Sequence, residues 1–414
     1  MLRGGVVPKI WRWIGQNSWR EPDFILCTFL RLKIIYGLLF FQMKHLLGIA
    51  AWGLLLSLVC CHVWAAAQNN TTDRQKAFEY WQQAISLMDN EQRYDEAILL
   101  LQQASALDGH NPAYRYEMAY AYYRQKKYGE TIKILKRTVR SSKATADYYR
   151  LLGNAYDLLN NINKAEKTYR RGLKKFPNTG SLYAELGGLA YKRGNNDKAI
   201  QEWEKGIEYS PTFNSNYYWA ATLYCHSSEK LWGLIYGELF MLLEPNGDRN
   251  EEMSDLLFST YGKCIKEATP STGSGFSASE MAQRYLLLDE TERDTLLPFP
   301  VLFNLSSEWA MPTPLRNKDI ATISAIRQGF ASHWFSEQNN RHYPNVLFDW
   351  WQKVANAGHS EAYTYWLMRK GAPQEFETWL TYNSKKFHDF LEWFNRNAMA
   401  INKKQRFFKM QYAQ

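Results

Sequence analysis

One period organises this sequence, because the same residue types return every 34 positions between residues 78 and 247. The clearest column is proline, at Pro177, Pro211 and Pro245. Three columns of small residues keep the same step: Gly153 and Gly187, then Ala97, Ala165 and Ala199, then Gly172 and Gly206. A fixed period of this length predicts a stack of similar units, each of which buries its apolar face against its neighbours.

Five consecutive units follow from this period, with bounds at 78–111, 112–145, 146–179, 180–213 and 214–247. The third unit is the clearest, and its two predicted helices carry Tyr149, Leu152, Gly153 and Tyr156, then Ala165, Tyr169, Gly172 and Pro177. This arrangement resembles the tetratricopeptide repeat family, whose units read W-x-x-L-G-x-x-Y, then A-x-x-x-F/Y, a small residue and a proline. The resemblance implies an all-α fold, a superhelical solenoid of helix-turn-helix repeats over residues 78–247.

The pattern has a physical basis. Glycine or alanine lets paired helices approach closely, and proline ends the second helix because it has no N–H to donate. Some units depart from the pattern, at Gly109 in unit one, Thr131 and Lys143 in unit two, and Gly233 and Phe240 in unit five. The outermost units of such arrays act as caps, so we expect units one and five to deviate and unit two to be the weak one.

The residues before the repeats predict export. Residues 43–67 begin at Met43 with a short basic start, continue with an apolar run and end in three alanines before Gln68. This order is typical of a secretory signal peptide cleaved before Gln68, although the segment is also long enough to be an uncleaved membrane anchor. Residues 1–42 fit neither interpretation, because basic residues interrupt their apolar run. We interpret them as a doubtful extension of a chain that starts at Met43.

The net charge does not indicate nucleic-acid binding. The formal charge is +9, but residues 1–67 hold seven Lys or Arg against two acidic residues. More than half of the net positive charge therefore precedes the repeats. No nucleic-acid-binding motif accompanies the positive charge in the rest of the chain. We expect protein or peptide partners and no nucleic acid.

Two cysteines, Cys225 and Cys264, follow the predicted signal segment. They could pair as a disulfide in an exported protein, and the alternative, which we favour, is two buried free thiols. No Cys/His cluster has the spacing of a metal site, so no metal or cofactor is expected.

After the repeats the period is lost. Residues 248–268 predict a helix that covers the last unit, and the Ser- and Gly-rich residues 269–275 predict a linker. The remainder, 276–414, is rich in aromatic residues and predicts a mostly helical region, either a small domain or an irregular continuation of the solenoid. Prolines between residues 296 and 314 predict an irregular stretch. Helices are expected over 320–335, 346–357, 360–370 and 376–398.

Seven tryptophans crowd this last region: Trp309, Trp334, Trp350, Trp351, Trp366, Trp379 and Trp393. They would either fill a core or form an exposed surface for a carbohydrate or peptide. No metalloprotease, nucleophile-elbow, P-loop or dinucleotide motif is present in the sequence, so we do not expect an enzyme.

The resemblance implies where a ligand would bind, since family members use one face of the first helix of each unit. The positions that correspond here are Tyr116, Tyr120, Tyr123, Arg150, Asn154, Asp157, Tyr191 and Tyr218. Arg150 and Asn154 have the spacing that chaperone-tail-binding members use to clamp a terminal carboxylate. Glu185 stands where the next unit of that clamp needs asparagine, and its charge would repel a carboxylate, so that ligand is not expected.

We therefore predict an exported bacterial scaffold without catalytic activity, which holds peptide segments or partner proteins of the cell envelope. In this setting the chain is periplasmic, or anchored to the membrane by residues 43–67. The alternative is an enzyme or a glycan-binding module in residues 276–414, with the repeats as its docking arm. A cytoplasmic adaptor would require that residues 43–67 do not act as a signal.

Overall fold

The computed structural model describes residues 71–267, 275–276, 297–311 and 317–412. Residues 76–414 form one compact unit. The regular elements of the described residues are all helical, which confirms the predicted all-α class. The predicted extension over 1–42, the signal or anchor segment over 43–67 and all but the last residue of the linker over 269–275 lie outside the described residues.

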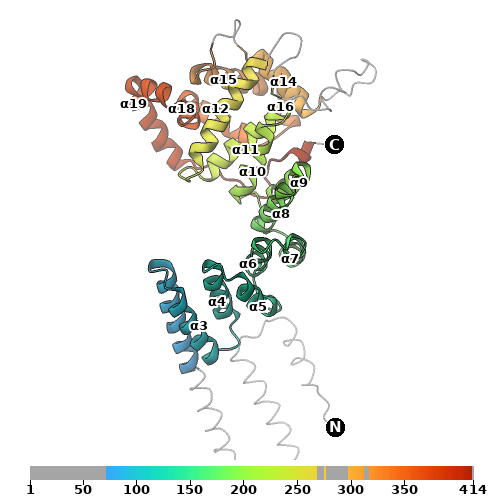
Figure 1. The fold of residues 1–414 in the computed structure, drawn as a ribbon. Coiled ribbons are helices and arrows are strands. Elements are labelled where there is room, and N and C mark those ends of the chain that lie inside the picture. The colour runs from blue at the N-terminus through green and yellow to red at the C-terminus, as the bar shows by residue number, and fades with distance from the viewer. Residues whose placement is uncertain (1–70, 268–274, 277–296, 312–316, 413–414) are drawn as a thin grey trace, which may run out of the picture. The chain divides into compact units, whose positions relative to one another are not determined.

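The repeat region consists of paired helices, shown in blue to light green in Figure 1. A helix over residues 71–90 pairs with α3 (Tyr94–Leu107), and four more pairs follow. These are α4 (Pro112–Arg124) with α5 (Tyr128–Thr138), α6 (Ala146–Leu158) with α7 (Ile162–Lys175), α8 (Gly180–Lys192) with α9 (Asn196–Tyr209), and α10 (Asn214–Cys225) with α11 (Lys230–Leu243).

The starts of these pairs follow the 34-residue period. Helices α4, α6, α8 and α10 begin at the first residues of the second to fifth predicted units, Pro112, Ala146, Gly180 and Asn214. The first helix already includes residue 71, the first described residue, seven positions before the expected start of the first unit at residue 78. It is longer than the other first helices because the polar residues before Phe78 continue the helix.

Each helix packs against the next along the chain, and the first helices of successive units also contact one another in the order α4, α6, α8, α10 and α12. This second set of contacts places the first helices side by side. Their residues therefore share one surface, whereas the second helices lie behind them.

Glycines permit the close approach within a pair. A Cβ atom added to Gly153 would lie 2.1 Å from Cε1 of Tyr169, and one added to Gly187 would lie 2.1 Å from Nε1 of Trp203. Both distances are far shorter than any carbon contact, so the large ring on the second helix occupies the space that a side chain would need. In both repeats the glycine of the first helix therefore contacts the aromatic ring of the second helix.

We expect Gly187→Ala to lower the free energy of unfolding by about 1–3 kcal/mol, because the added methyl group displaces the indole of Trp203. The adjacent Gly188 is the matched control, since nothing lies within 4 Å of a Cβ added there. Gly188→Ala should be neutral or stabilising by up to about 1 kcal/mol through helix propensity. Urea unfolding of both variants would test this, and equal stabilities would contradict the proposed contact.

The remaining helices follow the last repeat and are coloured yellow to red in Figure 1. They are α12 (Asn250–Glu267), α14 (Phe299–Trp309), α15 (Ile320–Ser336), α16 (Asn339–His342), α17 (Val346–Asn356), α18 (Ser360–Met368), α19 (Pro373–Arg396) and a short 3-10 helix, η1 (Lys409–Tyr412). Four of these, α15, α17, α18 and α19, overlap the four helices predicted in the last region.

One expectation about this region was wrong. Prolines were predicted to keep the stretch after residue 296 irregular, but α14 begins at Phe299 directly after Pro298, and Pro300 lies in its first turn. Proline is tolerated there because the first N–H groups of a helix have no partner within the helix. The prolines therefore mark a helix start and do not prevent the helix.

The last two repeats and the C-terminal helices share one hydrophobic core. A single cluster of buried residues extends from Ala190 on α8 to Phe408 near the C-terminus. Helix α11 explains the continuity, because nearly all of its residues from Leu231 to Leu242 are buried, including those that would face solvent in a terminal repeat. Of the two alternatives for residues 276–414, this core favours a continuation of the solenoid.

A buried ion pair joins the two regions within this core. Glu238 of α11 accepts two hydrogen bonds of 2.7 Å from the guanidinium of Arg327 on α15. One oxygen of Glu238 also accepts from Nε1 of Trp351, at 2.5 Å, and from the hydroxyl of Tyr363, at 2.6 Å. Arg327 donates further to the hydroxyl of Tyr261 at 3.0 Å. Three helices of the C-terminal region, α15, α17 and α18, thus meet on one carboxylate of the fifth repeat, and α12 joins the network through Arg327.

Five of the seven tryptophans lie in the core: Trp334, Trp350, Trp351, Trp366 and Trp379 are each at most 9% exposed. Trp393 is half-buried, and Trp309 is 63% exposed. The core interpretation therefore holds for most of these tryptophans.

Cys225 and Cys264 are buried free thiols, which is the alternative that we favoured, and burial raises the pKa of Cys225 to about 11. Within the described part of the chain, none of the helices has both the length and the apolar character to cross a membrane.

Candidate functional site

The predicted ligand positions lie on the first helices, and contacts between neighbouring helices connect them. We call this face the first-helix surface, defined by Tyr116, Tyr120, Tyr123, Arg150, Asn154, Asp157, Glu185, Tyr191 and Trp219. The surface extends over α4, α6, α8 and α10 because each of these helices contacts the next.

Three tyrosines occupy the α4 part of the surface, and all are half-buried. The ring of Tyr116 stacks on Tyr148 of α6 with centroids 4.5 Å apart, and burial raises the pKa of Tyr116 to about 12. The hydroxyl of Tyr120 accepts a hydrogen bond of 2.9 Å from Arg124. Tyr123 packs edge-on against Tyr128 with centroids 5.5 Å apart. These rings therefore fill the joint between neighbouring helices as well as facing outward.

The middle of the surface is a polar cluster between α6 and α8. Asn154 donates a hydrogen bond of 3.1 Å from Nδ2 to Glu185, and its Oδ1 accepts one of 2.6 Å from the hydroxyl of Tyr169. Arg150 pairs with Asp147 at 3.1 Å. Asp157 pairs with Lys192 of α8 at 2.9 Å. The amide of Asn154 therefore already has partners within the protein. One of these partners is Glu185, the residue whose charge was expected to repel a carboxylate ligand.

Two carboxyl groups along the first helices have no cation within ion-pair distance among the described residues. Burial, together with the nearby Asp89, raises the pKa of Glu117 to about 7. Burial also raises the pKa of Glu185, although the hydrogen bond from Asn154 and the charge of Arg150 oppose it. A positive group brought to either carboxylate would therefore be favoured.

Two exposed aromatic side chains lie at the far end of the surface. Tyr191 of α8 is 52% exposed and Trp219 of α10 is 42% exposed. Both rings lie against the buried indole of Trp203, with centroid distances of 6.4 Å and 6.2 Å. Trp219 is not among the predicted ligand positions, because it lies one residue after Tyr218, the position that the family resemblance indicates.

The structure corrects one predicted ligand position. Tyr218 is 4% exposed, and its hydroxyl donates a hydrogen bond of 2.5 Å to Glu252 of α12. The guanidinium of Arg249 lies over its ring, 4.7 Å from the centroid. Tyr218 is therefore part of the contact between the last repeat and α12, because the capping helix covers the position that would otherwise face a ligand.

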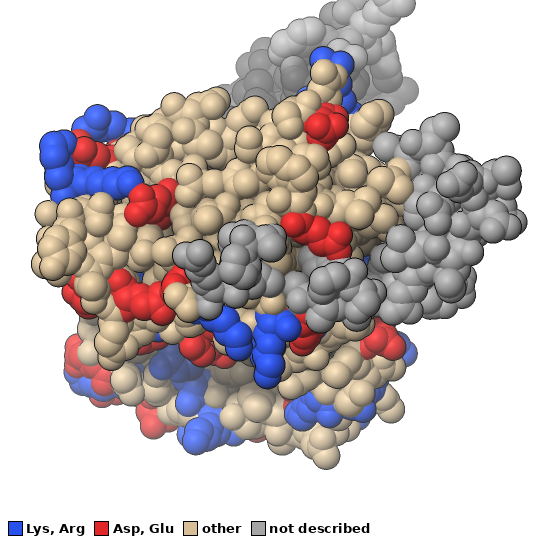
Figure 2. Space-filling model, turned by 90° about the horizontal axis from the view of Figure 1, so that it is seen from above, with Lys and Arg blue, Asp and Glu red and all other residues tan. Residues whose placement is uncertain are grey.

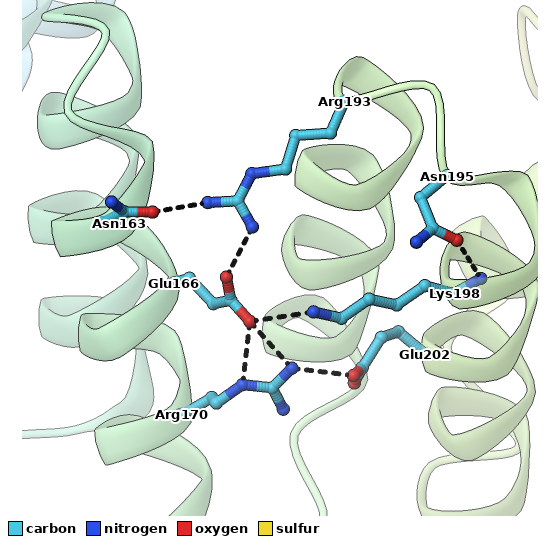
Figure 3. A network of polar contacts seen from close by, with 7 residues as sticks. All are labelled: Asn163, Glu166, Arg170, Arg193, Asn195, Lys198 and Glu202. Atoms are coloured by element: carbon cyan, nitrogen blue, oxygen red, sulfur yellow. Dashed lines mark hydrogen bonds and ion pairs between the residues drawn. The ribbon is translucent and has the colours of Figure 1, made fainter.

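A separate ionic network joins the second helices, α7 and α9, and includes Arg193 at the end of α8, as Figure 3 shows. Glu166 accepts from Arg193 at 2.7 Å, from Arg170 at 3.0 Å and from Lys198 at 3.2 Å. Burial by itself would raise the pKa of Glu166, but these three hydrogen bonds lower it to about 2. Arg170 also pairs with the buried Glu202 at 3.0 Å. The network links the third repeat to the fourth, and its charges already have partners.

The chemistry of the first-helix surface is that of recognition. It offers exposed rings for stacking, tyrosine hydroxyls for hydrogen bonds, and carboxyl groups that lack a cation. Among the residues that the structure describes, no group of three His, Cys, Asp or Glu side chains could hold a metal ion.

Known proteins resemble the repeat region. Two family models, both described as tetratricopeptide repeat, match residues 90–155 and 150–212. No curated protein sequence matches the chain. The fifth predicted unit lies beyond both family matches, as expected for an atypical terminal unit.

Solved structures resemble part of the chain. PilF of Pseudomonas aeruginosa is 14% identical with a TM-score of 0.41, and the similarity covers 47% of this chain and 87% of that one. A tetratricopeptide repeat protein of Thermus thermophilus is 18% identical with a TM-score of 0.37, over 44% and 98% of the two chains. YrrB, described as having an unusual peptide-binding site, is 18% identical with a TM-score of 0.31, over 41% and 87%.

Proposed function

We propose that the protein is a scaffold that holds segments of partner proteins on its first-helix surface, because residues 90–212 match two tetratricopeptide repeat models. The observation that carries this proposal is the pair of exposed rings, Tyr191 and Trp219, beside a polar cluster. Large apolar rings are costly to leave in water, and exposed groups of them mark binding surfaces.

The arrangement suits an extended peptide. Gly188 lies between Glu185 and Tyr191 on α8, and the space next to its Cα is open. A peptide backbone can approach a helix closely where no side chain projects, while the rings on either side stack against its side chains. Aromatic and arginine residues supply most of the binding energy at such surfaces.

The same geometry disfavours a terminal carboxylate as the ligand. Asn154, which would have to donate to that carboxylate, donates to Glu185 instead. Glu185 occupies the partner position of Asn154, and when ionised it would repel a terminal carboxylate. A partner segment with a lysine or arginine side chain complements this charge better.

We expect the double variant Tyr191→Ala/Trp219→Ala to weaken binding of a partner segment by about 2–4 kcal/mol, which is at least roughly thirtyfold in the dissociation constant. A photo-crosslinking residue at position 191 of the full chain would first identify the partner, and a peptide of the crosslinked segment would then be titrated by calorimetry. Trp309→Ala is the matched control, because Trp309 is 63% exposed and lies outside the repeats. Unchanged affinity in a double variant of normal helix content would remove the first-helix surface as the binding site.

We further propose that the scaffold acts outside the cytoplasm, in the bacterial cell envelope. Support comes from the apolar run within residues 43–67 and the three alanines before Gln68. The expected result is a mature chain that begins at Gln68, which mass spectrometry of the exported protein would detect. A secreted chain that retains residues 43–67 would indicate a membrane anchor instead, and a chain found in the cytoplasm would contradict export.

A further inference from the structure

A second candidate site lies outside the first-helix surface, between the C-terminal helices. A pocket of about 550 Å³ is bounded by side chains of α15, α17, α18 and α19. This volume lies within the range of small-molecule sites, roughly 300–1,000 Å³. Its inner wall includes Arg327, Trp351 and Tyr363, which belong to the buried Glu238 network and therefore hold their positions rigidly.

The outer lining of this pocket is rich in neutral polar side chains. Gln328, Ser332, Gln352 and Asn356 all contribute to it. Within the described part of the chain, the side chains of Ser332, Gln352 and Asn356 make no hydrogen bond. Amide and hydroxyl groups can both donate and accept, so they match a ligand whose own groups do both.

A second hollow continues from the first. It has a volume of about 450 Å³ and shares Gly358 and Lys386 with the first pocket. Gly358 follows the end of α17 with a φ of 76°, and nothing lies within 4 Å of a Cβ added there, while the side chain of Lys386 borders both hollows. We call the lining of these two neighbouring hollows, from Ser332 to Tyr382, the track.

An exposed ring stands at the end of this track. Tyr382 lines the second hollow and is 84% exposed. It precedes a kink in α19 at Asn383, where the backbone leaves helical geometry and the side-chain amide donates to the carbonyl of Trp379 at 2.9 Å. The flat faces of aromatic rings stack on the C–H faces of sugar rings, because both surfaces are apolar and their C–H groups point at the π-electrons.

The charges along the track are neutralised within the protein. Both terminal nitrogens of the Arg327 guanidinium, Nη1 and Nη2, donate to Glu238. Lys386 pairs with Glu361, which also accepts from Nε1 of Trp379 at 2.7 Å. Lys385 pairs with Asp389 at 2.7 Å. A charged ligand would have to compete with these pairs, whereas a neutral one leaves them intact.

The remaining titratable group along the track is His359, and burial lowers its pKa in spite of the opposing charge of Asp389. The imidazole is therefore neutral at neutral pH and adds no charge for an anion. Figure 2 agrees with this picture at a coarser level, because the face formed by the C-terminal helices is mainly neutral, with acidic and basic residues dispersed over it.

We propose that this track binds a neutral oligosaccharide, with Tyr382 as a stacking platform and Gln352, Asn356 and Ser332 as hydrogen-bond partners of its hydroxyl groups. A chain of sugar rings has hydroxyls that donate and accept, apolar C–H faces and no charge, and these three properties match the three features of the track. The site is independent of the first-helix surface, so the scaffold and glycan-binding proposals can fail separately.

The test uses the full chain and four neutral hexasaccharides, namely maltohexaose, cellohexaose, mannohexaose and xylohexaose, titrated by calorimetry. Hexagalacturonic acid serves as a charged comparison of similar length. We expect at least one neutral hexasaccharide to bind, and Tyr382→Ala and the double variant Gln352→Ala/Asn356→Ala each to weaken it by roughly tenfold. Trp309→Ala, which removes an exposed ring outside the track, should leave the affinity unchanged.

Three results would contradict binding of a neutral sugar along the track. Failure of all four neutral hexasaccharides to bind at millimolar concentration would overturn the proposal, as would tighter binding of hexagalacturonic acid. Equal losses in Tyr382→Ala and Trp309→Ala would show that the sugar does not use the track. Ser384→Ala, at an exposed position of the second hollow, provides a second variant should the double variant lose helix content.

Discussion

Replacing Arg327 by methionine is expected to lower the free energy of unfolding by about 3–5 kcal/mol, because it leaves the charge of Glu238 buried without a cation. Arg327 is 6% exposed and Glu238 is 2% exposed, so water cannot replace the lost partner. The guanidinium also stacks over Trp351, 4.5 Å from its ring centroid, and methionine keeps only part of that packing. Urea unfolding followed by circular dichroism measures the loss.

A double variant separates the charge from the packing. In Arg327→Met/Glu238→Gln the buried charge is absent, and the glutamine oxygen can still accept from Trp351 and Tyr363. Its stability should therefore recover part of the loss seen in Arg327→Met. A double variant less stable than Arg327→Met alone would indicate that the loss of the ion pair is not the main cause of the destabilisation. Since the network joins α11 to α12, α15, α17 and α18, unfolding of the repeats and of the C-terminal helices should remain a single transition in the parent.

Phe407→Ala is expected to cost a similar amount, about 3–5 kcal/mol, because it empties a site at the centre of the shared core. Phe407 is fully buried, with ring centroids at 5.7 Å from Trp232, 5.8 Å from Phe299 and 6.0 Å from Phe348. These rings come from α11, α14 and α17, so one side chain near the C-terminus holds three helices together.

The same segment supplies its control. Met410 lies three residues away and is 61% exposed, so Met410→Ala should change the stability by no more than about 0.5 kcal/mol. Lys409 anchors the segment between them, with its backbone N–H donating to Tyr236 at 2.8 Å and its ammonium pairing with Glu229 at 2.6 Å. If both variants unfold at the same urea concentration, the C-terminal segment does not stabilise the core.

The repeat region was predictable from the sequence for a physical reason. Each unit buries the same kind of face against its neighbours, so the requirement for a small residue recurs at a fixed interval and shows as a column. The contact of Gly187 with Trp203 is one case, since the sequence places the two 16 positions apart, as it does Gly153 and Tyr169. Interactions within one unit and with the next one are short in sequence, and a period reports them directly.

The candidate site was predictable only in part. The family resemblance placed Tyr191 and Asn154 on one face of the first helices, where they are found, but it also included Tyr218, which the capping helix covers. Whether a side chain is exposed depends on what packs against it from elsewhere in the chain. Glu252, the partner of Tyr218, lies one period of 34 residues away on α12, but α12 lacks the residue columns of the repeat, so the sequence did not indicate this contact. The exposed Trp219 was not predicted, because it directly follows the position that the family resemblance indicates.

The sequence by itself determined the helical class, the 34-residue period and the starts of the second to fifth helix pairs, because these depend on residues close together in the chain. Only the tertiary structure decided that the C-terminal helices cover the last repeat. Glu238 and Arg327 lie 89 residues apart, and Arg406 reaches Glu208 across 198 residues. No local pattern records such pairs, since a buried charge needs one partner in space and places no requirement on where in the sequence that partner lies.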